Sequence, residues 1–355
     1  LPAGIFVDAL GSVYIADAEN HRIQKWAKGA TEGVTVAGGN GPGNNPNQLN
    51  GPQSVFVDAT GAILIADAGN HRIQKWFEGL SSGVTIAGFG GEGAGLNQLS
   101  TPVGIWADAA GRLYISDQNN HRVIRYNSGE ISGTVIAGGN GPGSNSNQLN
   151  TPQGIYVDAS GNLFIADGFN HRVQRWDNGA TTGITIAGGN GLGNAPNQLN
   201  NPQGVFIDGA GQIYIADKTN HRIQRWVAGA SRGTTIAGDS TGVLGSSLSR
   251  MQFPSGIAMD PTGNLFVSDQ NNLRVLRFNI SSIMRNYTAV SGGKYFVEAT
   301  AFNGCNVSSD SITVNESPRL LVNGNTLICS GDTTDITATG ADVYSWSPVT
   351  GVSNS

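Results

Sequence analysis

Five histidines recur at intervals of 50 residues, each inside the same Asn-His-Arg triplet: His21, His71, His121, His171 and His221. Imidazole is a common zinc ligand, so a ring of histidines could hold a metal ion. Equivalent turns of units repeated around an axis, however, lie on the order of 10 Å from that axis, whereas zinc binds nitrogen at about 2.1 Å. The spacing therefore predicts a structural role for the histidines, with neither a metal nor another cofactor.

An aspartate stands three residues before each triplet, and with the arginine of the triplet it brackets a short turn. A carboxylate beside a guanidinium could be a catalytic acid next to an electrophile, but catalysis does not need six such pairs. We expect repeated structural ion pairs, which contribute most where they are desolvated between neighbouring units. The pairs are Asp17 and Arg22, Asp67 and Arg72, Asp117 and Arg122, Asp167 and Arg172, Asp217 and Arg222, and Asp269 and Arg274.

Amide side chains recur at two further positions of the repeat. Amides donate and accept hydrogen bonds, so they suit the hydroxyls of a sugar or the backbone of a peptide, whereas phosphate prefers clustered Arg and Lys. We expect these residues to form one neutral, amide-rich binding face around an axial depression. The candidate ligand-binding residues are Gln53, Gln153, Gln203, Asn40, Asn140 and Asn190.

The elements that would position these residues follow the same 50-residue interval, which governs six units up to about residue 278. Within residues 151–200, segments 154–157, 162–166, 172–176 and 183–187 are rich in β-branched and aromatic residues, which predicts four strands. Four antiparallel strands repeated six times predict an all-β fold, a six-bladed β-propeller. The unbroken apolar run of the first strand predicts burial on both faces, between neighbouring blades.

These motifs carry a family resemblance. Asn-His-Arg followed by Ile or Val, with Asp three residues before the Asn and Pro-x-Gly-Ile/Val-x-Val-Asp upstream, resembles the NHL repeat. The resemblance implies a six-bladed propeller over residues 1–279, of a kind used mostly as a binding platform. The sixth unit departs from the pattern, since Leu273 replaces the histidine and no Thr-Ile-Ala-Gly segment follows Phe278. We expect a segment preceding Leu1, or alternatively residues 286–300, to complete that blade.

The chain changes character after Asn279, where Ser, Thr, Asn and Val predominate. Residues 293–297 with Asn303-Gly304-Cys305 resemble the closing half of the immunoglobulin-like repeats of secreted Bacteroidota proteins, and residues 325–351 resemble the opening half. The resemblance implies a partial module at 280–317 and the start of a second at 318–355. It also implies that the partner of Cys305 would precede it, that the partner of Cys329 would lie beyond residue 355, and that the protein is exported, to the cell surface or beyond.

The composition argues against several classes of function. With 20 basic and 25 acidic residues, the chain lacks the positive charge that nucleic-acid binding needs, and its two cysteines do not supply a RING domain. No apolar run is long enough to span a membrane. We predict a non-catalytic binding or scaffold module whose partner is a protein, peptide or glycan. Two alternatives stay open: a metal-dependent propeller enzyme resembling peptide-amidating lyase or lactonase, and a regulatory module like the NHL domains of ubiquitin ligases.

Overall fold

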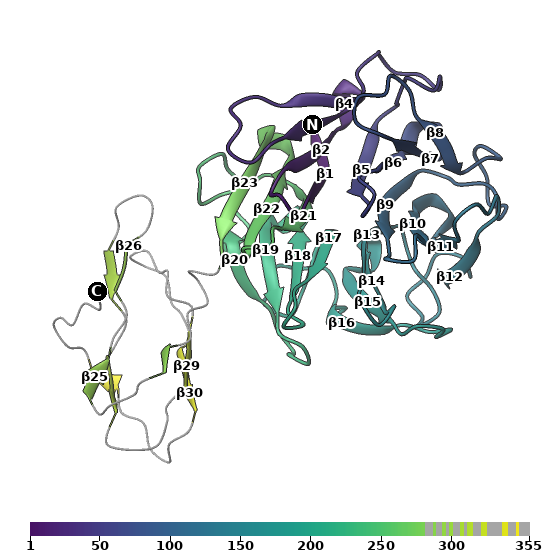
Figure 1. Cartoon of the computed structure of the whole chain (residues 1–355). Coiled ribbons are helices and arrows are strands. Elements are labelled where there is room, and N and C mark those ends of the chain that lie inside the picture. Colours follow the sequence, from purple (N-terminus) through teal and green to yellow (C-terminus); the bar gives the residue numbers. More distant parts are fainter. Residues whose placement is uncertain are drawn as a thin grey trace. The chain divides into compact units, whose positions relative to one another are not determined.

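The structure is a computed structural model that describes residues 1–280 and the backbone of eight short strands further along the chain. The chain divides into two compact units, Leu1–Phe278 and Asn279–Ser355. In the first unit, six antiparallel sheets surround a central axis, with the first strand of each sheet innermost (Figure 1). The predicted six-bladed β-propeller is confirmed.

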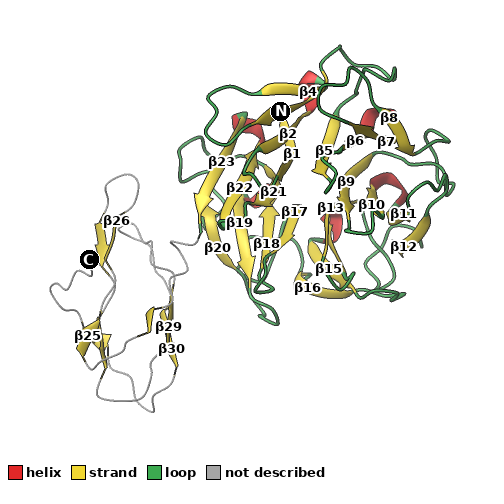
Figure 2. Ribbon diagram, viewed as in Figure 1, coloured by secondary structure: helices red, strands yellow, loops and turns green. Residues whose placement is uncertain are grey.

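The first five blades have four strands each, in chain order from the axis outward (Figure 2). Blade 1 comprises β1 Pro2–Val7, β2 Val13–Asp17, β3 Arg22–Trp26 and β4 Val34–Gly38. Blade 2 comprises β5 Pro52–Val57, β6 Ile63–Asp67, β7 Arg72–Trp76 and β8 Val84–Ala87. Blade 3 comprises β9 Pro102–Ala107, β10 Leu113–Asp117, β11 Arg122–Tyr126 and β12 Thr134–Gly138. Blade 4 comprises β13 Pro152–Val157, β14 Leu163–Asp167, β15 Arg172–Trp176 and β16 Ile184–Gly188, and blade 5 comprises β17 Pro202–Ile207, β18 Ile213–Asp217, β19 Arg222–Trp226 and β20 Thr234–Gly238.

A one-turn 3-10 helix joins the second and third strands of every blade and ends at the Asn of the triplet. These turns are η1 Ala18–Asn20, η2 Ala68–Asn70, η3 Gln118–Asn120, η4 Gly168–Asn170, η5 Lys218–Asn220 and η6 Gln270–Asn272. Because the turn and the start of the first strand lie at the same end of the blade, the long connections between blades meet the turns on one face of the ring. We call this the upper face.

The sixth blade is a three-stranded sheet of β21 Pro254–Met259, β22 Asn264–Asp269 and β23 Arg274–Asn279. The tryptophan that ends the third strand is more exposed in blade 1, whose preceding neighbour in the ring is the three-stranded blade 6. Trp26 is 36% exposed, whereas its equivalent in blade 2, Trp76, packs in a cluster with residues of blade 1 and is 2% exposed. The strands within residues 286–300 pair with other strands of the C-terminal unit. The expectation that those residues complete the sixth blade therefore finds no support.

In blades 2 to 5 burial on both faces belongs to the second strand, which corrects the expectation for the first strand. In blade 4 all of Leu163–Asp167 is buried, whereas Gly154 and Tyr156 of the first strand are only half-buried. The difference arises because the first strand turns alternate residues toward the central channel, while the second strand lies between two neighbouring blades.

The hydrophobic core is divided into layers between adjacent blades. One cluster, for example, joins Tyr114 and Ala137 of blade 3 to Ile155, Ile165 and Trp176 of blade 4. A corresponding layer joins blades 6 and 1 and includes Ile5, Val7, Ala258 and Phe266. The Ser255 hydroxyl also donates to the carbonyl of Ala3 at 3.3 Å, so the innermost strands close the ring.

Glycine allows the innermost strands to approach one another closely. A Cβ on Gly154 would lie 2.6 Å from the carbonyl oxygen of Gln203 and 3.2 Å from the Cα of Gly204. Gly4, Gly104, Gly204 and Gly256 occupy the same place in their blades, and Ser54 is the exception. At five of the six joints, a side chain here would force neighbouring blades apart.

The described strands of the second unit form three small sheets, β24-β29-β30, β25-β28-β31 and β26-β27. Their bounds are β24 Tyr287–Thr288, β25 Gly293–Tyr295, β26 Glu298–Thr300, β27 Asn306–Ser308, β28 Ser311–Val314, β29 Leu321–Gly324, β30 Ile336–Thr339 and β31 Trp346–Ser347. Cys305 and Cys329 lie outside the described residues. The division into immunoglobulin-like modules at 280–317 and 318–355 stays a prediction.

Candidate binding site

The Asn-His-Arg triplet holds both connections that flank its blade. His121 Nδ1 accepts the backbone N–H of Thr151 at 3.1 Å, at the end of the connection that leaves its blade. In the next blade, the amide of Asn170 donates to the carbonyl of Gly143 at 2.8 Å, in the connection that enters. Each connection is thus held by the histidine of the blade that precedes it in the chain and by the asparagine of the blade that follows it.

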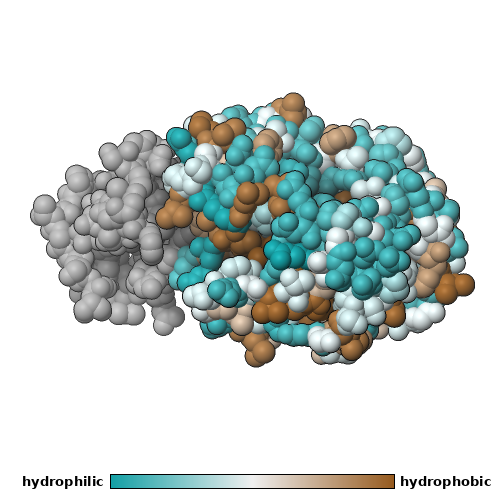
Figure 3. All heavy atoms as spheres, turned by 90° about the horizontal axis from the view of Figure 1, so that it is seen from above, coloured by the Kyte–Doolittle hydropathy of each residue, from teal (hydrophilic) through white to brown (hydrophobic). Residues whose placement is uncertain are grey.

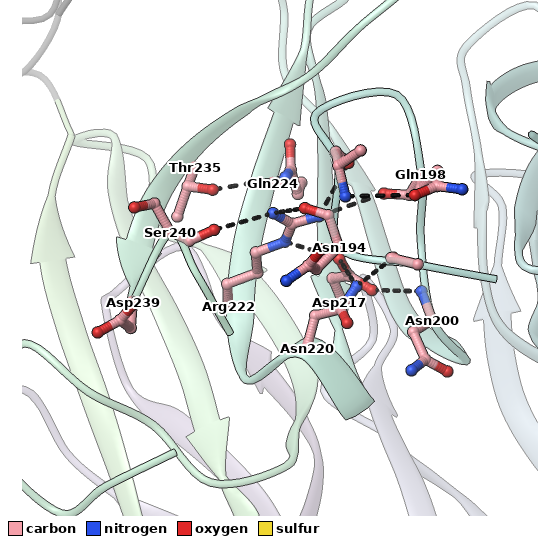
Figure 4. Close-up of polar contacts among 12 residues, drawn as sticks. Asn194, Gln198, Asn200, Asp217, Asn220, Arg222, Gln224, Thr235, Asp239 and Ser240 are labelled. Carbon is pink, nitrogen blue, oxygen red and sulfur yellow. Dashed lines mark hydrogen bonds and ion pairs between the residues drawn. The ribbon is translucent and has the colours of Figure 1, made fainter. Parts of the chain in front are cut away.

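The aspartate and arginine complete this brace, as Figure 4 shows for blade 5. Asp217 Oδ2 accepts from Arg222 Nε and from the amide of Asn220, both at 2.8 Å. Its Oδ1 accepts the backbone N–H of Asn200 at 2.7 Å. Arg222 Nη1 donates to the carbonyl of Asn194 at 2.7 Å. The ion pair therefore positions the connection, and these polar atoms of Asp217 and Arg222 already have hydrogen-bond partners within the fold.

All six predicted Asp–Arg pairs form, with N–O distances of 2.7–2.9 Å, but their burial differs. The arginine side chain is 36% exposed at Arg22 and 2% exposed at Arg222. Burial raises the pKa of Asp217. At Asp17 the hydrogen bonds from Asn20 and Arg22 outweigh desolvation and lower the pKa.

Each histidine adopts a left-handed backbone conformation, with φ between 51° and 55°, and so does Leu273 at 55°. In blades 1 to 5 the imidazole Nδ1 accepts a backbone N–H, so the neutral imidazole is the form that the fold requires. Burial lowers the pKa of His121, His171 and His221, although nearby aspartates oppose the shift.

Acidification is therefore expected to destabilise the propeller through these histidines. A pKa that is lower in the folded than in the unfolded state gives stability that is present above about pH 6.5, the unfolded value, and is lost as pH falls through the folded value. We expect the melting temperature to fall between pH 7.5 and pH 5.5. Changing His121, His171 and His221 together to Asn, which also tolerates the left-handed conformation, should flatten this dependence; an equal slope in both proteins would contradict the assignment.

A cavity of about 190 Å³ lies on the axis, among the six innermost strands. Gln53, Gln153 and Gln203 line it near the upper face, as expected from the sequence. Each glutamine donates one amide hydrogen to a residue two positions before it, at 3.2–3.4 Å. No further hydrogen bond of these three side-chain amides is found among the described residues, and Gln153 is the most buried of the three, at 6% exposed.

Aromatic residues surround the channel three positions further along the strands, about 10 Å deeper. The ring centroids of neighbouring members are 4.5–5.3 Å apart. The members are Phe6, Phe56, Trp106, Tyr156 and Phe206, and Ala258 takes this place in blade 6. These residues were not predicted as a set, although their 50-residue spacing is visible in the sequence. The cavity thus has amides at its upper mouth and aromatic rings deeper in.

Asn40, Asn140 and Asn190 lie in the connections of the upper face and are not among the residues that line the axial cavity. Their role in ligand binding stays a prediction. Each donates to a carbonyl seven residues further on, at 2.8–2.9 Å. Their amide N–H groups therefore brace the connections from within, a use that spacing alone did not predict.

The cavity is also less neutral than the sequence suggested, because Lys218 lines it. This lysine opens η5 and is half-buried. Lys218 was not predicted, because only the positions that enter the first strand were assigned to the mouth. Aligning the turns of the six units would have found Lys218, since it is the one charged residue at its position.

The part of the chain that the structure describes contains no group of three or more His, Cys, Asp or Glu side chains placed to hold a metal ion. Each histidine stands in its own blade, with Nδ1 engaged by the next connection.

Among the residues that the structure describes, no helix has the length and apolar character needed to cross a membrane. Exposed hydrophobic residues are scattered among hydrophilic ones in Figure 3.

The family model of the NHL repeat matches residues 1–26, 49–76, 149–176, 199–226 and 251–278. The unmatched third unit has the same triplet, Asn120-His121-Arg122, and the same four strands. Residues 1–278 therefore form an NHL-repeat six-bladed β-propeller. No curated protein matches the sequence.

Three solved structures illustrate the fold. An auxiliary nutrient binding protein from Bacteroides thetaiotaomicron has a TM-score of 0.59 and 18% identity, over 78% of this chain and 68% of that chain. A gluconolactonase from Xanthomonas campestris has a TM-score of 0.55 and 13% identity, over 75% and 82%. A streptogramin B lyase has a TM-score of 0.51 and 15% identity, over 78% and 92%. At these identities the likeness shows the fold alone.

Proposed function

We propose that the propeller is the non-catalytic binding module of an exported or cell-surface protein, and that it holds a peptide, a glycan or an exposed segment of a protein at the upper mouth of the axial cavity. The observation that carries this proposal is the set of glutamines at the mouth, whose amide groups are only partly used by the fold. Ligand sites are typically concave and carry a few polar groups that fix orientation.

The surroundings of the mouth support the same conclusion. The ion pairs and asparagines of the upper face are engaged in bracing the connections, so they hold the mouth in a fixed shape. A rigid site loses little conformational entropy on binding. The nutrient binding role named for the Bacteroides thetaiotaomicron structure is compatible with a propeller that binds a ligand without transforming it.

Changing Gln153 and Gln203 together to Ala is expected to weaken ligand binding by about 1–3 kcal/mol, the worth of one or two hydrogen bonds from each amide. Glycan and peptide arrays would identify a ligand, and calorimetry would then compare affinities. Ser160 and Gln212 lie in turns at the opposite end of their blades, so the matched double change to Ala should leave binding intact.

Equal losses in the two double variants would contradict the placement of the site. Metal analysis of the purified protein addresses the competing class of function: one zinc or calcium ion per chain would favour a metal-dependent lyase or lactonase over a binding module.

A further inference from the structure

Lys218 is a departure from the repeat that the fold does not require. It opens η5 and lines the axial cavity, at a position where the other five blades have neutral residues. Those residues are Ala18, Ala68, Gln118, Gly168 and Gln270. Because the five equivalent turns form with neutral residues, the turn of blade 5 does not need a lysine in order to fold.

The ammonium group of Lys218 has no counter-ion in the described part of the chain. The neighbouring carboxylate of Asp217 is engaged by Arg222 at 2.8 Å. The strands packed against η5, β17 and β21, contain no titratable side chain. Desolvation without a compensating charge lowers the pKa of Lys218. A half-buried ammonium of this kind is costly to keep charged, and an anion in the cavity would relieve that cost.

Polar residues line the cavity together with the lysine. Those nearest to it in the order of the blades are Gln203, Ser255 and Gln270 of blades 5 and 6, and Gln53 and Gln153 line the cavity from blades 2 and 4. The amide of Gln203 donates one hydrogen to Asn201 Oδ1 at 3.2 Å and keeps the other. An ammonium and amide N–H groups that line one cavity form a donor set for a carboxylate. A single cation matches one negative charge, and phosphate would want a cluster.

We propose that Lys218 binds the carboxylate of a small ligand in the axial cavity, with Gln203 and Gln270 as additional hydrogen-bond donors. This inference rests on the proposed binding function and narrows its ligand to one that carries an acid. The cavity, about 190 Å³, is smaller than the ~300–1,000 Å³ of typical ligand pockets, so it takes one terminal residue and not an oligomer. The carboxylate comes from an acidic sugar or from the C terminus of a peptide.

The test compares each acid with a neutral counterpart: glucuronate with glucose, and triglycine with its C-terminal amide. Affinities are measured by NMR titration for the wild-type chain, for Lys218→Gln and for Lys28→Gln. The first change installs the residue that blades 3 and 6 have at this position, so the turn should fold. The second removes the same charge from an exposed site at the opposite end of blade 1.

We expect one acid to bind the wild-type chain at least about tenfold more tightly than its neutral counterpart, as a charge-assisted hydrogen bond would provide. That acid identifies the source of the carboxylate. The preference should disappear in Lys218→Gln and persist in Lys28→Gln. Since only the charged lysine attracts the acid, the preference should also fall as pH rises through the lowered pKa of Lys218, before the range of an ordinary lysine.

Three results would overturn the proposal: neutral and acidic probes that bind the wild-type chain equally, a preference that survives Lys218→Gln, or no binding of either acid at millimolar concentration. In the first two cases the binding function stands while the role of Lys218 falls. In the third, the array experiment with the Gln153 and Gln203 variant decides the binding function independently.

Discussion

Asp167→Ala is expected to lower the free energy of unfolding by about 3–5 kcal/mol, the cost of breaking a buried ion pair on one side. The Asp167 side chain is fully buried, and Arg172 Nε lies 2.8 Å from its Oδ2. Asp167 also accepts the backbone N–H of Asn150 at 2.7 Å and the amide of Asn170 at 2.8 Å. The substitution leaves all three donors without this acceptor.

Chemical denaturation would measure the loss, with Asp17→Ala as the matched control. Asp17 makes the same pair, but Arg22 is 36% exposed, so water replaces the lost partner and a smaller cost is expected. Adding Arg172→Met to Asp167→Ala should recover part of the stability, because it removes the unpaired charge. Equal losses at positions 17 and 167 would mean that burial of the pair does not matter.

Gly154→Ala is expected to cost about 1–3 kcal/mol, the usual range for overpacking a closely packed interior. The added methyl would lie 2.6 Å from the backbone oxygen of Gln203, which belongs to the next blade and has no room to rotate away. Relief would require the innermost strands β13 and β17 to separate.

Ser54→Ala is the matched control, since Ser54 occupies the same place in blade 2 and already carries a Cβ. Thermal unfolding should therefore distinguish the two variants, with a lower melting temperature for Gly154→Ala only. Indistinguishable melting temperatures would show that the ring can widen at this joint without cost.

The fold was predictable because its signals are periodic. Proline and aspartate return in all six units, at intervals of 50 residues and of 52 before the sixth, and the Asn-His-Arg triplet returns in the first five. The ion-pair partners followed from the same period. Side-chain direction did not follow, because it depends on how blades are tilted around the axis. For that reason the sequence placed full burial on the first strand, whereas the structure places it on the second.

The candidate site was only partly predictable, for a related reason. Gln153 was located correctly at the cavity because the start of an innermost strand must face the axis. The hydrogen bond of the Asn140 amide was not predictable, since nothing in its spacing reveals that a carbonyl within its own connection accepts from it. Lys218 was not predicted because it is an exception to the repeat, and a repeat pattern indicates only the residue types that recur.

The brace around each connection also bears on how such a chain changes length. A connection is held by a histidine from one unit and by an asparagine and arginine from the next, as His121, Asn170 and Arg172 do for residues 139–151. Within residues 1–250, any segment of 50 residues therefore carries one histidine, one asparagine and one arginine of the brace, wherever it begins. Recombination between two such nearly equivalent units would add or remove a whole blade and would leave every connection with its hydrogen-bond partners. These local contacts therefore do not limit the number of units. The number six must then be set elsewhere, by the curvature at which the inner strands meet around the axis.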